Sequence, residues 1–435
     1  MRSVDPSTLL VRATALYLPT LLVLALAVQV RPSQRRIAGA LLATCWNVPA
    51  LLALNLVAVR SGWWTFQPGT ATVSGVPADL WIGWALLWGA VPLLATTSRL
   101  VAAGLVLVAV DLVLMPLGEP VVVLNGTWLF GETAAVATCL VPGLILGRLT
   151  ARDEAVRGRS VLQVIGFTGL LGFVLPSLIF TATGESWAPL LNRPRWHFVL
   201  AAAILAPAGA MAIQAVREFA AHAGTPVPLD PPRALVTTGP YAYVANPMQL
   251  GATILLAAWG FLLSSPTVVA AAVMAAAFSA GVAAVAEARE LPARFGDAWH
   301  DYRPHTRLWW PAWRPQVGAG AVVYVAQTCG PCSEVGRFLL ARRPVGLEVR
   351  PAEESPFPLE RITYVRAETR EAGVAAVGRS LEHANLAWAV AGWIARLPVV
   401  DQVLQLIADA VGFGPRSIAQ PADTAVSDSR RGRCR

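Results

Sequence analysis

The sequence predicts a polytopic α-helical membrane protein of about nine spans that ends in a small α/β domain. The 435 residues are 55% hydrophobic and only 14% charged, with a mean hydropathy of +0.55, which is far from the composition of a soluble globular protein. Several windows reach the roughly 20 consecutive apolar residues that a helix needs to cross a bilayer. After Pro311 the pattern changes to short strand-like and amphipathic stretches, which predict a folded domain outside the membrane.

Nine apolar segments are the candidate spans. They cover Leu9–Val30 and about 37–59, 79–97, 100–117, 128–149, 161–182, 197–215, 248–263 and 266–286. No small-residue cleavage site precedes the arginine cluster that follows the first segment, so we expect a retained helix and not a cleaved signal peptide.

The arginines predict the orientation of the chain. The net charge of +8 comes from arginine alone, because the sequence contains no lysine. Clusters at 31–36, 148–159 and 289–294 follow the first, fifth and ninth spans, and alternation puts all three on one side. The positive-inside rule makes that side the cytoplasm, although Arg193 and Arg195 fall on the opposite side in this count. No basic helix interleaved with aromatic residues is seen, so no nucleic-acid partner is expected.

The first five spans contain two isolated acids, Asp111 and Glu132. A charge in lipid is costly, so such a residue marks a functional site, pairs with a neighbouring helix or lies near the interface. Pairing or a place near the interface is the favoured interpretation, and the role of these spans stays unassigned. The loops opposite the arginine clusters, such as 62–78 and 118–127, are poor in arginine and rich in Gly, Pro, Thr and Trp.

The stretch 236–311 contains most of the predicted chemistry. Gly239 and Pro240 predict a turn, and Asn246 and Pro247 predict the start of a helix, with Asn as N-cap and Pro at the first position. The start of that helix would present free backbone N–H groups to the cytoplasmic side, where they can hold a carboxylate or a phosphate.

A hydrophobic hairpin then returns the chain to the same surface. Its turn is predicted at 264–266, so Glu287 emerges at the level of Asn246, with Glu290 on the same helical face. An amphipathic, aromatic-rich segment follows up to Pro311, and it is expected to lie along the membrane surface. By composition alone, this segment is equally compatible with a membrane anchor that has no catalytic role.

These residues resemble a known family. The pattern G-P-Y-x-Y-V-x-N-P-M-x-L-G, followed about forty residues on by E-x-x-x-L-x-x-x-F-G-x-x-x-x-x-Y, is similar to the core of the isoprenylcysteine carboxyl methyltransferase and phospholipid methyltransferase superfamily. The resemblance covers about 200–313. It implies a cytosolic-side pocket for S-adenosylmethionine that opens to the bilayer for a lipid or isoprenoid-like acceptor. The family usually reads V-R-H-P-x-Y where 244–249 reads V-A-N-P-M-Q, so the Arg, the His and the second Tyr are replaced.

The resemblance also implies which residues form the site. The expected cofactor-binding residues are Tyr241, Tyr243, Asn246, Pro247, Gly251, Glu287 and Glu290. Glu287 is the best candidate for contacting the hydroxyls or the cationic portion of the cofactor. Arg294 and Arg303 could orient a carboxylate acceptor by a bidentate contact. No metal is expected.

The segment 320–416 predicts a small α/β unit. Residues 321–327 have the pattern of a buried strand, Cys329 and Cys332 form a C-x-x-C pair, and 333–342 has helical periodicity. This is the arrangement of thioredoxin-like redox sites, where an exposed first thiol, here Cys329, attacks and Cys332 resolves. Further strands are predicted at about 346–350 and 362–366, and helices at about 377–395 and 398–411.

Residues 378–416 resemble the DCC-type thiol-disulfide oxidoreductase-like family, as does the short strand before the cysteines. The resemblance implies a thiol-disulfide redox module with a cytoplasmic thiol reductant as partner. A zinc site is disfavoured, because no second C-x-x-C and no suitably spaced His pair follows. The alternative is a folded domain whose cysteines do no chemistry.

The sequence therefore predicts four parts. These are transmembrane helices of unassigned role at 1–196, a membrane methyltransferase-like core at 197–313, a thioredoxin-like domain at 320–416 and a disordered tail at 417–435. The predicted protein is an S-adenosylmethionine-dependent methyltransferase of the cytoplasmic membrane whose C-terminal redox domain is cytoplasmic. The alternatives are a membrane-anchored thiol-disulfide oxidoreductase with a non-catalytic anchor, and a binding or transport scaffold.

Overall fold

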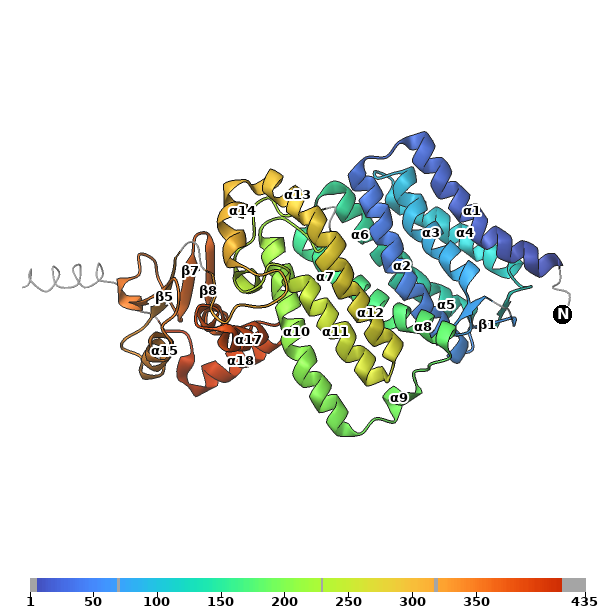
Figure 1. Cartoon of the computed structure of the whole chain (residues 1–435). Helices are drawn as coiled ribbons and strands as arrows, with labels where there is room; N and C mark the ends of the chain where they lie inside the picture. Colours follow the sequence, from blue (N-terminus) through green and yellow to red (C-terminus); the bar gives the residue numbers. More distant parts are fainter. Residues whose placement is uncertain (1–5, 69–70, 228–229, 317–319, 417–435) are drawn as a thin grey trace, which may run out of the picture. The chain divides into compact units, whose positions relative to one another are not determined.

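The computed structural model describes residues 6–68, 71–227, 230–316 and 320–416. The chain divides into two compact units, and each is described by itself (Figure 1). The first unit consists of Met1–Asn192, Ala223–Pro231 and Leu263–Val268, and the second of Arg193–His222, Pro232–Leu262 and Val269–Arg435.

The first unit is a bundle of apolar helices. Its helices are α1 Pro6–Val30, α2 Gln34–Arg60, α3 Ala78–Ala95, α4 Leu100–Leu117, α5 Trp128–Ala135, α6 Val141–Arg152, α7 Val156–Gly169, α8 Leu175–Thr183 and α9 Ala188–Leu191. π-helical turns at Val136–Leu140 and Leu170–Val174 join α5 to α6 and α7 to α8, so each pair continues as one long helix. The helix α2 packs against both α3 and α6 and forms the centre of this bundle.

The loops of the first unit gather at its two ends in the way that the arginine pattern predicts. At one end Arg35 forms an ion pair with Asp153 at 2.9 Å, which joins the start of α2 to the loop after α6. At the other end β1 Trp64–Phe66 pairs antiparallel with β4 Val122–Leu124, beside the small hairpin of β2 Thr72–Val73 and β3 Val76–Pro77. The arginine-rich loops therefore share one end, and the arginine-poor loops share the other.

Seven helices among the described residues are long and apolar enough to cross a membrane, or eight if the bent pair Leu386–Ala395 and Val400–Phe413 counts as one span. The seven correspond to the first seven predicted spans. The predicted count of nine is not reached, because the last two predicted spans are shorter helices. The helix α11 Pro247–Leu263 has 17 residues. At 1.5 Å per residue it extends about 25 Å, less than the bilayer core of about 30 Å. The chain is an integral membrane protein with multiple apolar helices.

The membrane part of the second unit contains α10 Arg195–Ala221, α11, α12 Pro266–Phe278, α13 Ala284–Phe295 and α14 Asp297–Tyr302. The helix α12 passes into α13 through a π-helical turn, Ser279–Ala283. Gly251 lets α11 approach α10 closely. A Cβ at Gly251 would lie 2.9 Å from Ala212 Cβ and 3.0 Å from the Ala208 carbonyl oxygen, which is too close for a larger side chain.

The segment that follows α14 packs along the turn that precedes α11. The helical part of this segment ends with the short 3-10 helix η5 Arg303–His305. The chain then runs back along the turn that precedes α11. Its backbone bonds join Ala245 to Arg307 at 2.9 Å and Ala312 to Tyr243 at 2.8 Å. The segment therefore forms part of the second unit's packing.

The C-terminal part of the second unit is a small mixed sheet with four helices. The strands are β5 Ala321–Val325, β6 Leu347–Pro351, β7 Thr363–Arg366 and β8 Thr369–Ala372, in the order β6-β5-β7-β8. β5 pairs parallel with β6 and antiparallel with β7, which pairs antiparallel with β8. The helices are α15 Gly330–Ala341, α16 Val374–Leu381, α17 Leu386–Ala395 and α18 Val400–Ala408.

The predicted strands at 321–327, 346–350 and 362–366 are confirmed as β5, β6 and β7. The predicted single helix at 377–395 is wrong, because the chain ends α16 and starts α17 at Asn385, whose side chain accepts a hydrogen bond from the Trp388 N–H. β8 was not predicted. The predicted domain boundary lies partly, and the predicted disordered tail at 417–435 lies entirely, outside the described residues.

Candidate functional site

A compact turn, 238–246, connects the chain to the start of α11. Its centre is the 3-10 helix η3 Gly239–Ala242. Gly239 has a φ of +59°, and a Cβ there would lie 2.9 Å from Glu218 Cγ, so the position favours glycine for two reasons. The Thr238 hydroxyl donates a hydrogen bond to the Glu218 carboxylate. The turn is thereby held against the C-terminal end of α10.

Tyr241 lies buried in this turn, and its ring stacks on Phe219 with the centroids 5.2 Å apart. The Tyr302 hydroxyl donates a hydrogen bond to the backbone carbonyl of Tyr241 at 2.8 Å. The Tyr241 hydroxyl itself has no hydrogen-bond partner among the described residues. Burial raises the pKa of Tyr241 well above its usual range, so the hydroxyl stays protonated and can donate to a ligand.

The helix α13 brings Glu287 to the start of α11, as the hairpin prediction requires. Asn246 Nδ2 donates to Glu287 Oε2 at 3.5 Å, and Gln249 Nε2 donates to Glu287 Oε1 at 3.4 Å. Burial raises the pKa of Glu287 more than these two bonds lower it, and the nearby Glu290 raises it further. Gln249 Oε1 is buried and has no partner in the described part of the chain. The site therefore combines a half-buried carboxylate with unpaired polar groups.

The other predicted site residues lie around this turn and along α11 and α13. Pro247 is the first residue of α11, and Gly251 contacts α10. Glu290 is exposed. Arg294 and Arg303 each donate to a backbone carbonyl at 3.0 Å, which holds neighbouring loops in place.

Tyr243 is enclosed within the second unit. Its hydroxyl donates to the carbonyl of Glu382 at 2.8 Å, and its ring meets the edge of Trp393 with the centroids 5.7 Å apart. The side chain is fully buried. These contacts fasten the turn to the C-terminal part of the unit and occupy both the hydroxyl and the ring of Tyr243.

A cluster of buried charges lies next to Tyr243. Arg379 forms ion pairs with Glu218 at 2.5 Å, with Glu371 at 3.1 Å and with Glu382 at 3.2 Å. Arg396 forms ion pairs with Glu382 at 2.7 Å and with Glu371 at 2.9 Å. Each charge has at least one opposite partner, which is what makes such a cluster stable away from water. Sequence reasoning missed it, because its members are far apart in the chain.

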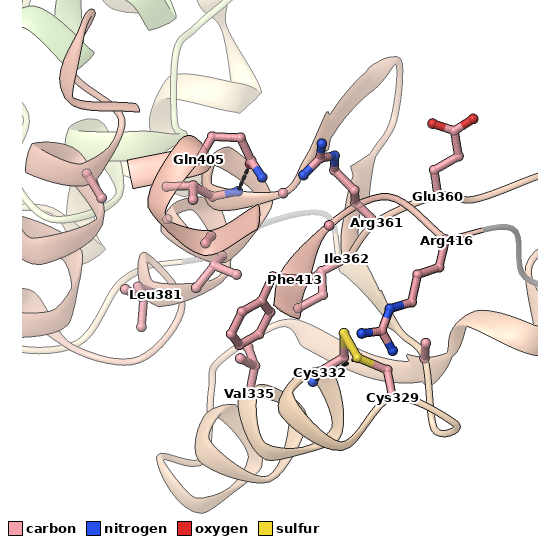
Figure 2. A pocket seen from close by; sticks show the side chains of 18 residues that line it. Cys329, Cys332, Val335, Glu360, Arg361, Ile362, Leu381, Gln405, Phe413 and Arg416 are labelled. Carbon is pink, nitrogen blue, oxygen red and sulfur yellow. Dashed lines mark hydrogen bonds between the residues drawn. A yellow bond between two sulfur atoms is a disulfide. The ribbon is translucent and has the colours of Figure 1, made fainter. Parts of the chain in front are cut away.

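Cys329 and Cys332 form a disulfide at the N-terminus of α15, with their Cα atoms 5.2 Å apart (Figure 2). The disulfide lines a cavity of about 230 Å³ with largely apolar walls, including Val335, Ile362 and Phe413. The prediction of an exposed first thiol is wrong. Cys329 is only 2% exposed, because it packs into the apolar cluster beside β5, whereas Cys332 is half-buried.

Comparison with known proteins bears on the membrane part of the second unit. Residues 196–298 match the family model described as phospholipid methyltransferase, a range that contains α10, the turn, α11, α12 and α13. No curated protein and no solved structure gave a significant match. The comparisons give no support for a thioredoxin-like domain or a redox module in the C-terminal part.

The described residues fit the cofactor of this family. Members of the family use S-adenosylmethionine, which carries hydroxyl, ammonium and carboxylate groups. The Glu287 carboxylate and Gln249 Oε1 can each accept a hydrogen bond from a group of this kind, and the unpaired Tyr241 hydroxyl can donate one. Residues 196–298 are thus a phospholipid methyltransferase family domain, and S-adenosylmethionine is the methyl donor of that family.

Proposed function

We propose that this chain transfers a methyl group from S-adenosylmethionine to a phospholipid or isoprenoid-like acceptor at the cytoplasmic face of the membrane. The observation that carries the proposal is the convergence of Asn246 and Gln249 on Glu287 within the matched range. The family itself implies a phospholipid acceptor. The positive-inside rule supports the cytoplasmic location, because Arg289 and Arg294 follow Glu287 closely.

The side chains have distinct roles in this proposal. Glu287 accepts hydrogen bonds from the hydroxyl or ammonium groups of the cofactor. Asn246 and Gln249 hold the Glu287 carboxylate in place. The Tyr241 hydroxyl, which lies in the turn before α11, donates a hydrogen bond to the cofactor. When bound, the cofactor supplies an electrophilic methyl group on a sulfonium. Asn246 cannot act as an acid or base near neutral pH, so the contribution of these residues is binding, orientation and exclusion of water.

Binding and transfer are tested on the purified full chain. Calorimetry with S-adenosylmethionine is expected to show saturable binding, and labelled methyl groups are expected to enter membrane lipids. Glu287→Gln should weaken cofactor binding by about tenfold or more, since it removes a charged acceptor. The matched control is Asp301→Asn, which removes an exposed carboxylate from α14. A folded protein without saturable binding would overturn the cofactor assignment.

The acceptor is identified by comparing the lipids of cells with and without the protein. A methylated phospholipid that disappears without the protein, and that Glu287→Gln fails to restore, supports a phospholipid acceptor. Loss of a methylated isoprenoid compound would assign the other class. Unchanged lipids, together with intact cofactor binding, would contradict lipid methylation.

A second candidate function is thiol-disulfide exchange at Cys329 and Cys332. The observation in its favour is the disulfide at the start of α15 beside an apolar cavity. In this proposal the thiolate of a cytoplasmic thiol reductant attacks the more exposed Cys332 Sγ, the S–S bond breaks, and Cys329 leaves as a thiolate. A second reductant thiol then releases Cys332 and completes the reduction. The reduced pair passes both electrons to a substrate disulfide.

Insulin reduction in the presence of dithiothreitol tests this second candidate. The wild-type chain is expected to accelerate the reaction, and both Cys329→Ser and Cys332→Ser are expected to abolish the acceleration. Cys45→Ser is the matched control, because Cys45 is a free cysteine in α2. Equal rates for the wild type and the double serine variant would exclude the activity.

A further inference from the structure

A second cavity lies inside the first unit, among residues that the proposed methyl transfer does not use. It has a volume of about 50 Å³, and side chains from α2, α3, α4, α5, β1, β3 and β4 line it. Four tryptophans face it together with two acids: Trp64, Trp81, Trp84, Trp88, Asp111 and Glu132. No lysine or arginine is among its lining residues in the described part of the chain.

The two acids that stand alone in their apolar segments of the sequence lie together here. Asp111 and Glu132 are 2% and 4% exposed, and both residues line the cavity. Trp84 Nε1 donates to Asp111 Oδ1 at 2.7 Å. Two adjacent carboxyl groups cannot both be ionised in an apolar bundle unless a cation neutralises them. The pair therefore holds either a shared proton or a cationic ligand.

Two further polar atoms at this cavity have no partner. Glu132 Oε1 and Trp88 Nε1 are buried, line the cavity and form no hydrogen bond to any described residue. Each buried unpaired group costs about 1–3 kcal/mol, so both favour a ligand that satisfies them. Glu132 requires a donor and Trp88 requires an acceptor. A ligand with an ammonium group and a nearby oxygen satisfies both at once.

The walls and the size of the cavity limit the ligand further. Tryptophan faces attract cations through the ring quadrupole, and this attraction strengthens where water is excluded. The cavity has a volume of about 50 Å³, so it accepts only a small ligand. A primary ammonium on a short oxygen-bearing chain is smaller than a trimethylammonium group on the same chain, so the size of the cavity favours the primary amine.

We propose that this cavity binds a small primary alkylammonium ion with a nearby oxygen, either as a free amino alcohol or as the end of a lipid headgroup. Trp64 and Val122 line the cavity and belong to the paired strands β1 and β4, so the site lies at the end of the bundle where loops emerge. The inference goes beyond the proposed methyl transfer and does not depend on it, because every lining residue belongs to the first unit.

The test is a titration of the purified full chain in detergent with ethanolamine at neutral pH, without S-adenosylmethionine. Intrinsic tryptophan fluorescence is the readout, since four tryptophans line the cavity. A saturable change is expected with ethanolamine. Ethylene glycol, which lacks the charge, and choline, which is larger, are expected to bind at least about tenfold more weakly. An equal response to ethylene glycol would overturn the proposal.

Variants locate the binding. Glu132→Gln is expected to weaken ethanolamine binding by about tenfold or more, because it removes the unpaired anionic acceptor. Glu119→Gln is the control, since it removes an exposed acid from the loop at the same end. If Glu132→Gln does not fold, Trp88→Phe keeps a ring and removes only the unpaired N–H. Unchanged affinity in the folded variant would place the binding elsewhere.

Nanodiscs distinguish the two sources of the ligand. In discs made of lipids with 2-aminoethyl headgroups, free ethanolamine should bind at least about tenfold more weakly than in discs with trimethylammonium headgroups if the headgroup occupies the site. Equal affinity in the two discs would assign the free amine. Absence of ethanolamine binding both in detergent and in the trimethylammonium discs would reject the site.

Discussion

His383 has a defined protonation state at the level of the single residue. Its Nδ1 lies 2.8 Å from the carbonyl oxygen of Val345, and its Nε2 lies 2.9 Å from the hydroxyl oxygen of Tyr364. A carbonyl oxygen only accepts, so Nδ1 carries the proton and Nε2 accepts from Tyr364. Burial, together with the positive charges of the nearby Arg366 and Arg379, lowers the pKa of His383 to about 4. The imidazole is therefore neutral in the folded protein at neutral pH.

This neutral imidazole predicts a pH dependence of stability. Between about pH 4 and the usual His pKa of about 6.5, the unfolded chain binds a proton that the folded chain excludes. The free energy of unfolding should therefore fall as the pH falls through this window, by roughly 3 kcal/mol in total for this residue. Backbone hydrogen exchange in residues 320–416 measures this free energy as the pH is varied. His383→Gln should flatten the pH dependence of the free energy of unfolding. His305→Gln, which replaces an exposed histidine, should leave it unchanged. Parallel curves for the wild type and His383→Gln would contradict the assignment.

Arg379 neutralises three carboxylates, and it is the residue of the charge cluster whose loss should cost most. Arg379→Ala leaves Glu218 buried without its cation, so the free energy of unfolding of the second unit should fall by about 3–5 kcal/mol. Hydrogen exchange in the second unit measures the change. Arg337→Ala is the control, because its side chain is 75% exposed and its effect should stay within about 0.5 kcal/mol. Similar small losses in both variants would show that the cluster contributes little.

At the scale of the element, Gly251 controls how closely α11 approaches α10. Gly251→Ala should destabilise the second unit by about 1–3 kcal/mol, because the new methyl group meets Ala212 and a backbone oxygen. Gly209→Ala is a matched change in α10, where the added Cβ would meet only Leu255 Cδ2 at 3.9 Å. It should be neutral or slightly stabilising. Thermal unfolding compares the two, and equal shifts would show that the contact is adaptable.

How well an element is predicted depends on whether its signal is local. The seven long helices follow from uninterrupted apolar length, which a lipid environment requires of each helix separately. β8, Thr369–Ala372, was missed because its polar side chains lack the alternation of a half-buried strand. The break at Asn385 was missed because the apolar periodicity runs through it, and the capping bond decides the boundary.

The candidate site also contains contacts that the local sequence predicts and contacts that it does not. The meeting of Asn246 with Glu287 was predictable, because a hairpin of known length returns the chain to its starting level. The contact of Tyr243 with Glu382 was not, since the two residues are 139 positions apart and no periodicity links them. Only the folded arrangement of the second unit reveals which of the turn's aromatic residues is available to a ligand and which is enclosed.

At the scale of the whole molecule, the ends of the first unit predict its orientation in the membrane. Ser33 and Ser74 are exposed and lie at opposite ends of that unit. With all five native cysteines replaced by serine, a membrane-impermeant maleimide should label Ser33→Cys only from the cytoplasmic side and Ser74→Cys only from the other. Labelling of both from the same side would contradict the orientation.

The contacts of Tyr243 and Glu218 also have a consequence for the order of synthesis. The turn that leads into α11 is translated well before Arg379, Glu382 and Trp393, yet those residues neutralise Glu218 and enclose Tyr243. A nascent chain whose apolar helices have all entered the membrane therefore still lacks a finished turn, and it carries an unneutralised carboxylate at the end of α10. Maturation of the candidate cofactor site is expected to wait until the ribosome has released the last helices of the C-terminal part, so that insertion and activation are separate events.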